Sequence, residues 1–211
     1  MAKGHDAICV FVNDHLNATM LRELKEMGIM AVLLTVNRYT HRAYTRTRDF
    51  NMSINGFMGM DLHGKTAGVI GTGRIGQAMI QILKGFGMRI IAYDPYPNET
   101  LDIEYDSIEN VFGQADVITL HCPLTPETKH IVQAKTIEMM KDGVYLINTS
   151  RGDLIRTEDP NLARLTTFPN VLVTSHMGFF TKEAVEAIAE VTLNNADAVR
   201  NGRKLENAVQ I

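Results

Sequence analysis

The sequence predicts an α/β fold in which a doubly wound parallel sheet carries helices on both faces. Three observations predict it: strand-like and helix-like segments alternate from residue 66 onward, a glycine-rich turn follows the first of these strands, and an acidic residue ends the next. Parallel strands must be joined by a crossover connection, usually a helix, so this alternation is typical of a parallel sheet.

Apolar, β-rich runs bounded by turn residues define the expected strands, and apolar residues at helical spacing define the helices between them. In chain order, these segments are TAGVIG, QAMIQILKGFG, MRIIAYD, DVITLHC, a polar helix over 135–141, GVYLINT and NVLVTS. The last of them covers residues 170–175. A final helix is predicted between Thr181, a favourable capping residue, and Gly202, which ends it.

The first part of the chain is organised differently. One strand is expected in AICVFV, followed by a short helix over 19–27 and a longer helix from about Ile29 through the basic segment NRYTHRAYTRTRD. We interpret the basic side chains of this segment as a solvated or subunit-facing helix surface rather than as an anion site.

Composition and charge argue against several classes of function. With 211 residues, 45% of them hydrophobic, the chain can bury a sizeable core. A net charge of -3 provides no positive field for nucleic acid or an anionic membrane, and no apolar run approaches the ~20 residues of a membrane helix. The N-terminus lacks the pattern of a signal peptide. Cys9 and Cys122 lie in apolar runs, as reduced thiols of a cytoplasmic protein do.

The glycine-rich turn follows the G-x-G-x-x-G pattern with Gly71, Gly73 and Gly76. Its context makes it specific, because it follows a strand, opens a helix and precedes a second strand that ends at Asp94. The first glycine permits a tight turn, the second lets the backbone approach a pyrophosphate, and the third allows the helix to pack closely on the strand. A Rossmann-type dinucleotide-binding domain is therefore predicted.

The same turn predicts which dinucleotide binds. Amides at the start of the helix would hold the phosphates, and Arg74 can add a charge-assisted contact. Asp94 would accept hydrogen bonds from the adenosine ribose hydroxyls and would repel a 2′-phosphate. We therefore expect NAD rather than NADP.

Three loops follow later strands of the sheet: HCPLTPET, TSRGD and SHMGF. Together with HRAYTRTRD, KTAGVIGTGRIGQAM and LKGFGMRIIAYDPYPN, they resemble the D-isomer-specific 2-hydroxyacid dehydrogenase family, with bacterial D-lactate dehydrogenases as the most similar branch. The resemblance covers almost the whole chain. Phe179 and Phe180, after the histidine, favour the lactate branch over the glycerate and phosphoglycerate branches.

The resemblance implies a role for each matching residue. Arg151 would bind the 2-oxo acid and polarise its carbonyl, and His176 would act as the general acid and base during hydride transfer. His121 has no chemical role in the family and is interpreted as structural, and Cys122 as a packed thiol. The remaining cofactor contacts implied by the family, besides the three glycines, fall on Arg74, Ile75, Asp94, Cys122, Pro123, Thr128, Thr149 and Ser150.

One catalytic residue of the family is missing. The family places a glutamate between the arginine and the histidine, hydrogen-bonded to the imidazole, and Glu158 follows Arg151 too soon to match it. A further Rossmann strand is also absent, so a join is predicted near Asp159 and Pro160.

Two more omissions are expected. A join near Gly28 and Ile29 lacks strands of the substrate domain and the loop that holds the substrate carboxylate, and an opening strand and helix would precede Met1. Residues 1–28 would then be the remnant of a second, smaller α/β substrate domain. Residues 29–176 would form the Rossmann domain, and 177–211 a C-terminal helix that returns towards the substrate domain.

Two explanations of the missing segments remain open. The chain is either a shortened form with impaired chemistry or the ordered segments of a longer, intact dehydrogenase. We favour the second, because loss of a strand between GVYLINT and NVLVTS would leave its neighbours without a partner. An intact mass near 23.5 kDa would instead support true shortening.

The resemblance thus implies a homodimeric, NAD-dependent D-2-hydroxyacid dehydrogenase that interconverts pyruvate and D-lactate or a close 2-hydroxy acid. Its partners would be a small 2-oxo or 2-hydroxy acid and a second copy, not nucleic acid or membrane. Glyoxylate or hydroxypyruvate reductase remains an alternative within the family. Outside it, the alternative is a catalytically inactive NAD-binding interaction module.

Overall fold

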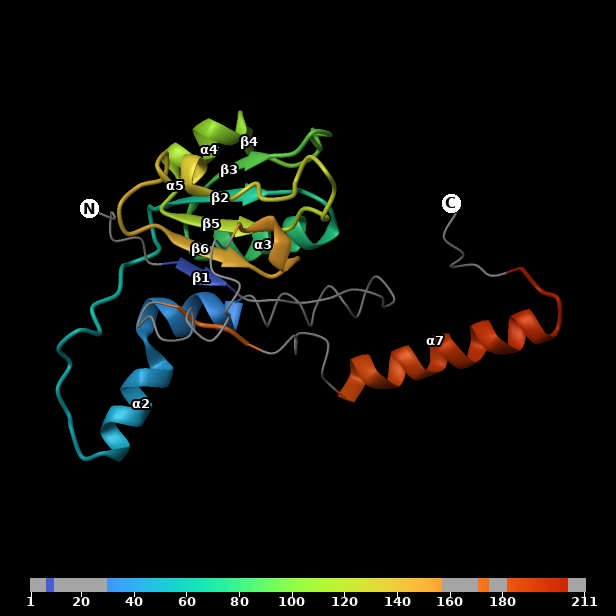
Figure 1. Cartoon of the computed structure of the whole chain (residues 1–211), viewed down its shortest axis with the longest axis horizontal. Helices are drawn as coiled ribbons and strands as arrows, with labels where there is room; N and C mark the ends of the chain where they lie inside the picture. The colour runs from blue at the N-terminus through green and yellow to red at the C-terminus, as the bar shows by residue number, and fades with distance from the viewer. Residues whose placement is uncertain (1–6, 10–29, 157–170, 175–181, 205–211) are drawn as a thin grey trace.

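A six-stranded parallel sheet forms the centre of the molecule (Figure 1). The structure, a computed structural model, describes residues 7–9, 30–156, 171–174 and 182–204. The strand order is β1-β6-β5-β2-β3-β4, and every neighbouring pair is parallel. This arrangement confirms the predicted α/β fold.

The strands of this sheet are short, and they are β1 (Ala7–Cys9), β2 (Thr66–Ile70), β3 (Arg89–Tyr93), β4 (Glu104–Tyr105), β5 (Val117–Leu120) and β6 (Tyr145–Asn148). The helices are a helix over 30–38, then α2 (Thr40–Arg48), α3 (Arg74–Gly85), α4 (Ile108–Gln114), α5 (Ala134–Ile137), a 3-10 turn η1 (Gly152–Leu154) and α7 (Lys182–Arg200).

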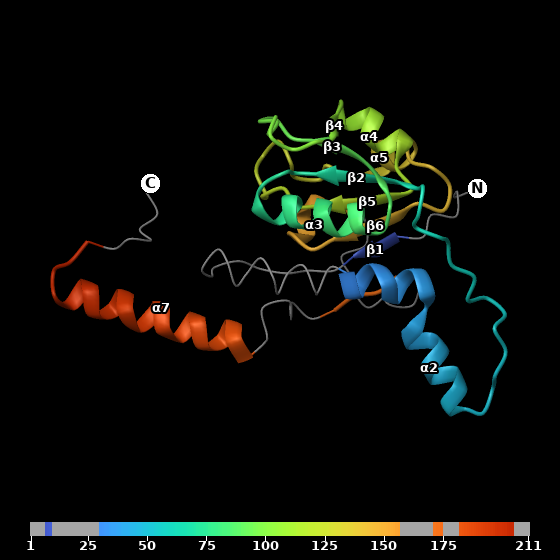
Figure 2. The same cartoon turned by 180° about the vertical axis from the view of Figure 1, so that it is seen from behind.

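Helices cover both faces of the sheet, and each face has its own apolar cluster (Figures 1 and 2). On one face, the helix over 30–38 buries Leu33, and α3 buries Met79 and Leu83. On the other, α4 buries Val111 and Phe112. Because both faces are covered, the central strands are apolar along almost their whole length rather than alternating.

The outer edge of β6 differs from the sequence prediction. We expected a strand over 170–175, but residues 171–174 form none, so that prediction is wrong over its described part. β1 pairs with β6 instead, from Ala7 with Leu146 to Cys9 with Asn148. Since β1 occupies the backbone groups of that edge, β6 has neighbours on both sides.

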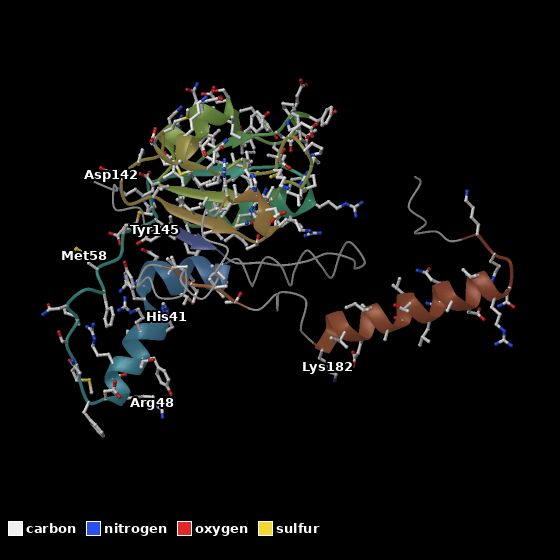
Figure 3. All side chains as sticks on the ribbon, viewed as in Figure 1. His41, Arg48, Met58, Asp142, Tyr145 and Lys182 are labelled. Atoms are coloured by element: carbon white, nitrogen blue, oxygen red, sulfur yellow. The ribbon has the colours of Figure 1, made fainter. Side chains whose placement is uncertain are left out.

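The predicted long helix from residue 29 is two helices. Tyr39 has a left-handed backbone with φ of 50°, which is uncommon for a residue other than glycine and ends the helix over 30–38. α2 then turns away from the sheet, and its side chains, from His41 to Arg48, are unburied throughout the described helix (Figure 3). The division reflects burial, because only the first helix packs on the core.

The final helix confirms its predicted end. α7 stops at Arg200, and Gly202 follows with φ of 64°. The Gly202 and Arg203 amides donate to the carbonyls of Val199 and Ala198, as at a left-handed helix terminus. α7 lies apart from the sheet in both views (Figures 1 and 2).

Most of the segment 1–28 and both predicted domain boundaries lie outside the described residues, so the domain division stays a prediction. In the part of the chain that the structure describes, no helix has the length and apolar character needed to cross a membrane.

Candidate active site

The predicted site residues lie together at the carboxyl ends of the strands, because all the strands of the sheet are parallel. From β2 the chain proceeds outward through β3 to β4, then returns to β5 on the other side of β2 and continues to β6. The strand order therefore reverses between β2 and β5, and ligands of open α/β sheets bind beside the carboxyl ends of the strands at such a point. The loops after β2, β3, β5 and β6 contain most of the predicted site residues.

Each glycine of the turn after β2 meets a different constraint. Gly71 has φ of 93°, and a Cβ there would lie 2.8 Å from the Cys122 amide nitrogen. A Cβ on Gly76 would lie 2.0 Å from the Gly71 carbonyl oxygen, so the helix can pack this closely only on a glycine. At Gly73, by contrast, a Cβ would meet no atom of the described chain within 4 Å. The turn is therefore tight on one side and open at Gly73.

The start of α3 faces this opening with unused donors. Gly73 is the N-cap, no side chain in the described structure caps the helix, and its first turn contains no acidic residue. The first amides of a helix lack intrahelical partners, and the helix dipole favours negative charge beside them. Arg74 is exposed and Ile75 half-buried at the first two positions. The arrangement suits the pyrophosphate of a dinucleotide.

Asp94, directly after β3, is held by the same turn. Its Oδ2 accepts hydrogen bonds from the Thr72 amide at 2.7 Å and from Thr72 Oγ1 at 3.1 Å. Its Oδ1 accepts from the Tyr96 amide at 2.9 Å. The predicted ribose-binding carboxylate therefore has one fixed orientation beside the glycine turn.

The loop after β5 packs against the glycine turn. Cys122 is buried, and burial, followed by the negative charge of Asp94, raises the pKa of its thiol to about 11. The thiol is neutral at pH 7, which agrees with a packed rather than a nucleophilic cysteine. Further along, Thr128 Oγ1 donates to the Pro123 carbonyl at 2.6 Å and accepts from the Thr125 amide at 2.8 Å, so the loop is internally braced.

The loop after β6 is tied to the loop after β5. Ser150 Oγ donates to the Cys122 carbonyl at 2.7 Å, and the Ser150 amide donates to Asn148 Oδ1 at 2.9 Å. Asn148 Nδ2 also donates to the Arg151 carbonyl at 2.7 Å. Arg151 is half-buried and immediately precedes η1. These bonds fix the backbone from which its guanidinium extends.

Thr149 gives an independent sign of a ligand. Its side chain is 7% exposed, and its Oγ1 has no hydrogen-bond partner within the described ranges. Because a buried hydroxyl without a partner is costly, a polar group of a bound molecule is a natural partner for it. With the open turn and the uncapped helix, this hydroxyl makes the residues present fit NAD.

The structure brings together most, but not all, of the predicted residues. His176 lies outside the described residues. Sequence reasoning missed Thr72, Tyr105 and Asn148, which orient predicted site residues. A hydroxyl residue inside the glycine pattern could have indicated Thr72, whereas nothing in the sequence marks Tyr105.

Among the described residues, no group of His, Cys, Asp and Glu side chains gathers as a metal site requires.

Comparisons with known proteins agree with this geometry. The sequence model of the D-isomer specific 2-hydroxyacid dehydrogenase NAD-binding domain matches residues 30–159. D-lactate dehydrogenase kk1H of Curvularia clavata is 37% identical, over 99% of this chain and 82% of its own length. D-lactate dehydrogenase of Escherichia coli K12 is 35% identical, over 98% of this chain and 87% of its own.

A solved structure shows the same similarity in three dimensions. The apo-structure of D-lactate dehydrogenase from Escherichia coli superposes with a TM-score of 0.83 at 35% identity, covering 96% of this chain and 85% of that one.

The alignments also bear on the missing segments. The one with the Curvularia protein spans 286 positions although this chain has 211 residues, so that protein has residues at aligned positions where this chain has none. The family match starts and stops beside the two predicted joins, at residues 30 and 159.

Proposed function

Because the chain belongs to the D-isomer-specific 2-hydroxyacid dehydrogenase family, we propose that it interconverts pyruvate and D-lactate, or a close 2-hydroxy acid. NAD, when bound, supplies or accepts the hydride. The observation that carries the proposal is the meeting of the open glycine turn, Asp94 and the Arg151 loop at one edge of the sheet. Relatives named D-lactate dehydrogenase support the choice of substrate.

The cofactor-binding residues divide by the part of NAD that each would hold. The first amides of α3 and the Arg74 side chain bind the pyrophosphate, and the absence of a side chain at Gly73 leaves room for it. Asp94 would accept a hydrogen bond from the adenosine ribose. The loops after β5 and β6 would hold the nicotinamide end through Cys122, Pro123, Thr128, Thr149 and Ser150.

Arg151 anchors the substrate in this proposal. A guanidinium presents a planar pair of donors to a carboxylate and stays charged at any physiological pH. Its backbone is fixed by Asn148, so the cation extends from a rigid point after β6. His176 acts as the general acid when pyruvate is reduced and as the general base in reverse, which an imidazole with a pKa of ~6.5 can do near neutrality.

The missing glutamate sets the expected rate. In the family it would favour and orient the protonated imidazole, and general acid-base assistance is worth roughly 10^2 to 10^4-fold. If the chain is shortened, turnover falls by a factor of this order. This consideration favours the second candidate function, a catalytically inactive NAD-binding interaction module.

We also propose a homodimer in the cytoplasm. Large apolar side chains are exposed on α2 and the loop after it, and burial against a second copy would remove them from water: Tyr44, Phe50, Met52, Ile54 and Met58. The buried free thiol of Cys122 suits a reducing compartment. Light scattering after size-exclusion chromatography tests the dimer, and a mass of one chain at micromolar concentration would contradict it.

Pyruvate-dependent oxidation of NADH, followed by absorbance, tests the activity. Arg151→Lys should lower kcat/KM for pyruvate by roughly 10- to 100-fold, because a charge-assisted bidentate contact is lost. Arg156→Lys is the matched control, since Arg156 is exposed, and its kcat/KM should stay unchanged. Comparison of kcat/KM for pyruvate, glyoxylate and hydroxypyruvate identifies the preferred acid.

His176→Ala separates the two candidate functions. A dehydrogenase should lose turnover and retain its affinity for NADH. Saturable NADH binding without turnover in the unmodified protein, unchanged by His176→Ala, would instead support the interaction module.

A further inference from the structure

A chain of hydrogen bonds leads from the edge strand β4 to the ribose-binding carboxylate. The Tyr105 hydroxyl donates to Thr72 Oγ1 at 3.0 Å, and Thr72 Oγ1 donates to Asp94 Oδ2 at 3.1 Å. The Tyr105 oxygen in turn accepts from the Asn98 amide at 3.1 Å. We refer to Tyr105, Thr72 and Asp94 as the hydroxyl relay.

The direction of the relay follows from the number of hydrogens available. An amide can only donate, so the Asn98 amide makes the Tyr105 oxygen an acceptor, and the single phenolic hydrogen is left for Thr72. The threonine hydroxyl then uses its own single hydrogen on Asp94, whose ionised carboxylate can only accept. Each member of the relay therefore fixes the orientation of the next.

The orientation of the Thr72 hydroxyl is important because the side chain is buried. Thr72 is 3% exposed, so its hydroxyl has little access to water, and Tyr105 is the partner that fills its acceptor position. Removal of the phenolic hydroxyl would leave the acceptor position of the buried Thr72 oxygen unfilled and would remove one of the two hydrogen bonds that fix its hydroxyl. Inside a protein such linked hydrogen bonds are stronger than in water and polarise one another.

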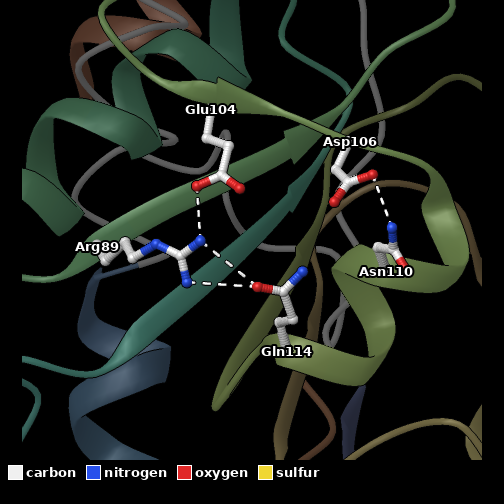
Figure 4. Close-up of polar contacts among 5 residues, drawn as sticks. All are labelled: Arg89, Glu104, Asp106, Asn110 and Gln114. Carbon is white, nitrogen blue, oxygen red and sulfur yellow. Dashed lines mark hydrogen bonds and ion pairs between the residues drawn. The ribbon is translucent and has the colours of Figure 1, made fainter.

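The backbone at Tyr105 is fixed by the pairing of the edge strand β4 with β3. Tyr105 pairs with Ala92 in the sheet, and the neighbouring Glu104 forms an ion pair with Arg89 at 2.6 Å (Figure 4). Arg89 also reaches Gln114 at the end of α4. Because the edge strand is fixed to β3 and α4, the tyrosine hydroxyl is already positioned before a ligand binds.

The relay leaves one defined acceptor position on the carboxylate. A carboxylate oxygen has about two lone-pair positions, and both on Asp94 Oδ2 are used, by the amide and the hydroxyl of Thr72. Oδ1 accepts from the Tyr96 amide and retains its second position. A ribose hydroxyl can therefore be bound by Oδ1 at an angle that the relay sets.

We propose that Tyr105 is a positioning residue for cofactor choice: through Thr72 it holds Asp94 so that the carboxylate accepts from the ribose 2′-hydroxyl and opposes a 2′-phosphate. The inference rests on the NAD assignment and not on the proposed substrate. Without the relay, the carboxylate keeps only the hydrogen bonds from the Thr72 and Tyr96 amides and is held less firmly, so binding of NADH weakens and repulsion of NADPH decreases.

Fluorescence titration of the whole protein with NADH and with NADPH tests the proposal without any turnover. Tyr105→Phe keeps the ring and removes the hydroxyl. The affinity for NADH should fall by about 5-fold, the change expected for one net hydrogen bond. The affinity for NADPH should stay constant or rise, so the ratio of the two affinities falls at least as much. Tyr44→Phe, on exposed α2, is the matched control and should leave both affinities unchanged.

A double-mutant cycle distinguishes positioning from a merely structural role. Thr72→Val should change the ratio of affinities like Tyr105→Phe, and the double variant should change it no further, because both substitutions interrupt the same relay. A lower melting temperature of Tyr105→Phe with an unchanged ratio would overturn the proposal. Fully additive effects of the two substitutions on the ratio would also overturn it. If the unmodified protein gave no saturable NADH signal, the NAD assignment itself would fail.

Discussion

Substitution of Gly73 by alanine should separate cofactor binding from folding. Gly73 has φ of -62° and ψ of -171°, an extended conformation that alanine adopts freely. Its Cβ would meet no atom of the described chain within 4 Å. Alanine is a poorer N-cap than glycine by roughly 0.5–1 kcal/mol, a cost that its effect on the unfolded chain offsets, so we expect little net change in stability. Alanine also restricts the unfolded chain, which typically stabilises a protein by about 0.4–1 kcal/mol.

The same methyl group should obstruct the cofactor. It would fill the opening in front of α3, where the pyrophosphate must approach the backbone amides. Loss of one charge-assisted hydrogen bond costs about 1.5–3 kcal/mol, so the Kd for NADH should rise roughly 10- to 100-fold. The assay combines fluorescence titration with NADH and thermal unfolding followed by circular dichroism.

Two other glycines of α3 provide matched controls. Gly85→Ala also places a Cβ where no described atom lies within 4 Å, but at the opposite end of the helix, so stability should not fall and the Kd for NADH should not change. Gly76→Ala places a Cβ 2.0 Å from the Gly71 carbonyl oxygen. Overpacking of this kind costs up to about 3 kcal/mol, which would lower Tm by roughly 6–12 °C.

Two outcomes for Gly73→Ala would contradict this interpretation. If Gly73→Ala bound NADH with unchanged affinity, the opening at Gly73 would not be the place of the pyrophosphate. If Gly73→Ala instead unfolded at the temperature of Gly76→Ala, the opening itself would be filled in solution.

Three further predictions concern other parts of the molecule. Asn37, 3% exposed, exchanges hydrogen bonds with both backbone groups of Met60 at 2.8 and 2.9 Å; Asn37→Ala should lower the free energy of unfolding by about 2 kcal/mol in urea titrations, and a change below about 0.5 kcal/mol would contradict its role. Burial raises the pKa of the Cys122 thiol from 9.0 to about 11. Because the unfolded chain loses this proton first, the thiol's contribution to stability is complete below pH 9 and decreases as the pH rises towards about 11. Between pH 9 and 11 the urea midpoint of Cys122→Ala should therefore decrease less than that of the unmodified protein. Arg89 and Glu104 are half-exposed, so a double-mutant cycle with alanine should give a coupling energy of only about 0.2–1 kcal/mol, and a much larger value would mean that the pair is less solvated than it is in the structure.

Some residues of the site could be predicted from the sequence, and others could not. The glycine turn could be predicted because each glycine has a local reason, such as the positive φ of Gly71, and because a strand and a helix flank it. Asp94 followed from its distance to that turn. Tyr105 could not be recognised, since it meets Thr72, 33 residues away in the chain, only when β4 pairs with β3.

The prediction for the outer edge of β6 was wrong. NVLVTS has the composition of a strand, yet residues 171–174 form none, whereas three residues from the start of the chain pair with β6. Strand propensity describes a fit to any sheet and not to a particular neighbour. Which segment pairs with an open edge strand depends on competition between segments for the same unpaired N–H and C=O groups of that strand.

The sequence by itself determined the alternation of strands and helices, the dinucleotide turn with its acid, and the loops that resemble one family. These features depend on neighbours along the chain and on backbone conformations that few residues adopt. Only the tertiary structure decided that β1 closes the sheet, that the helix after residue 29 divides at Tyr39, and that Tyr105 reaches Asp94 through Thr72. Each of these depends on contacts between distant segments, which form only when the whole sheet has assembled.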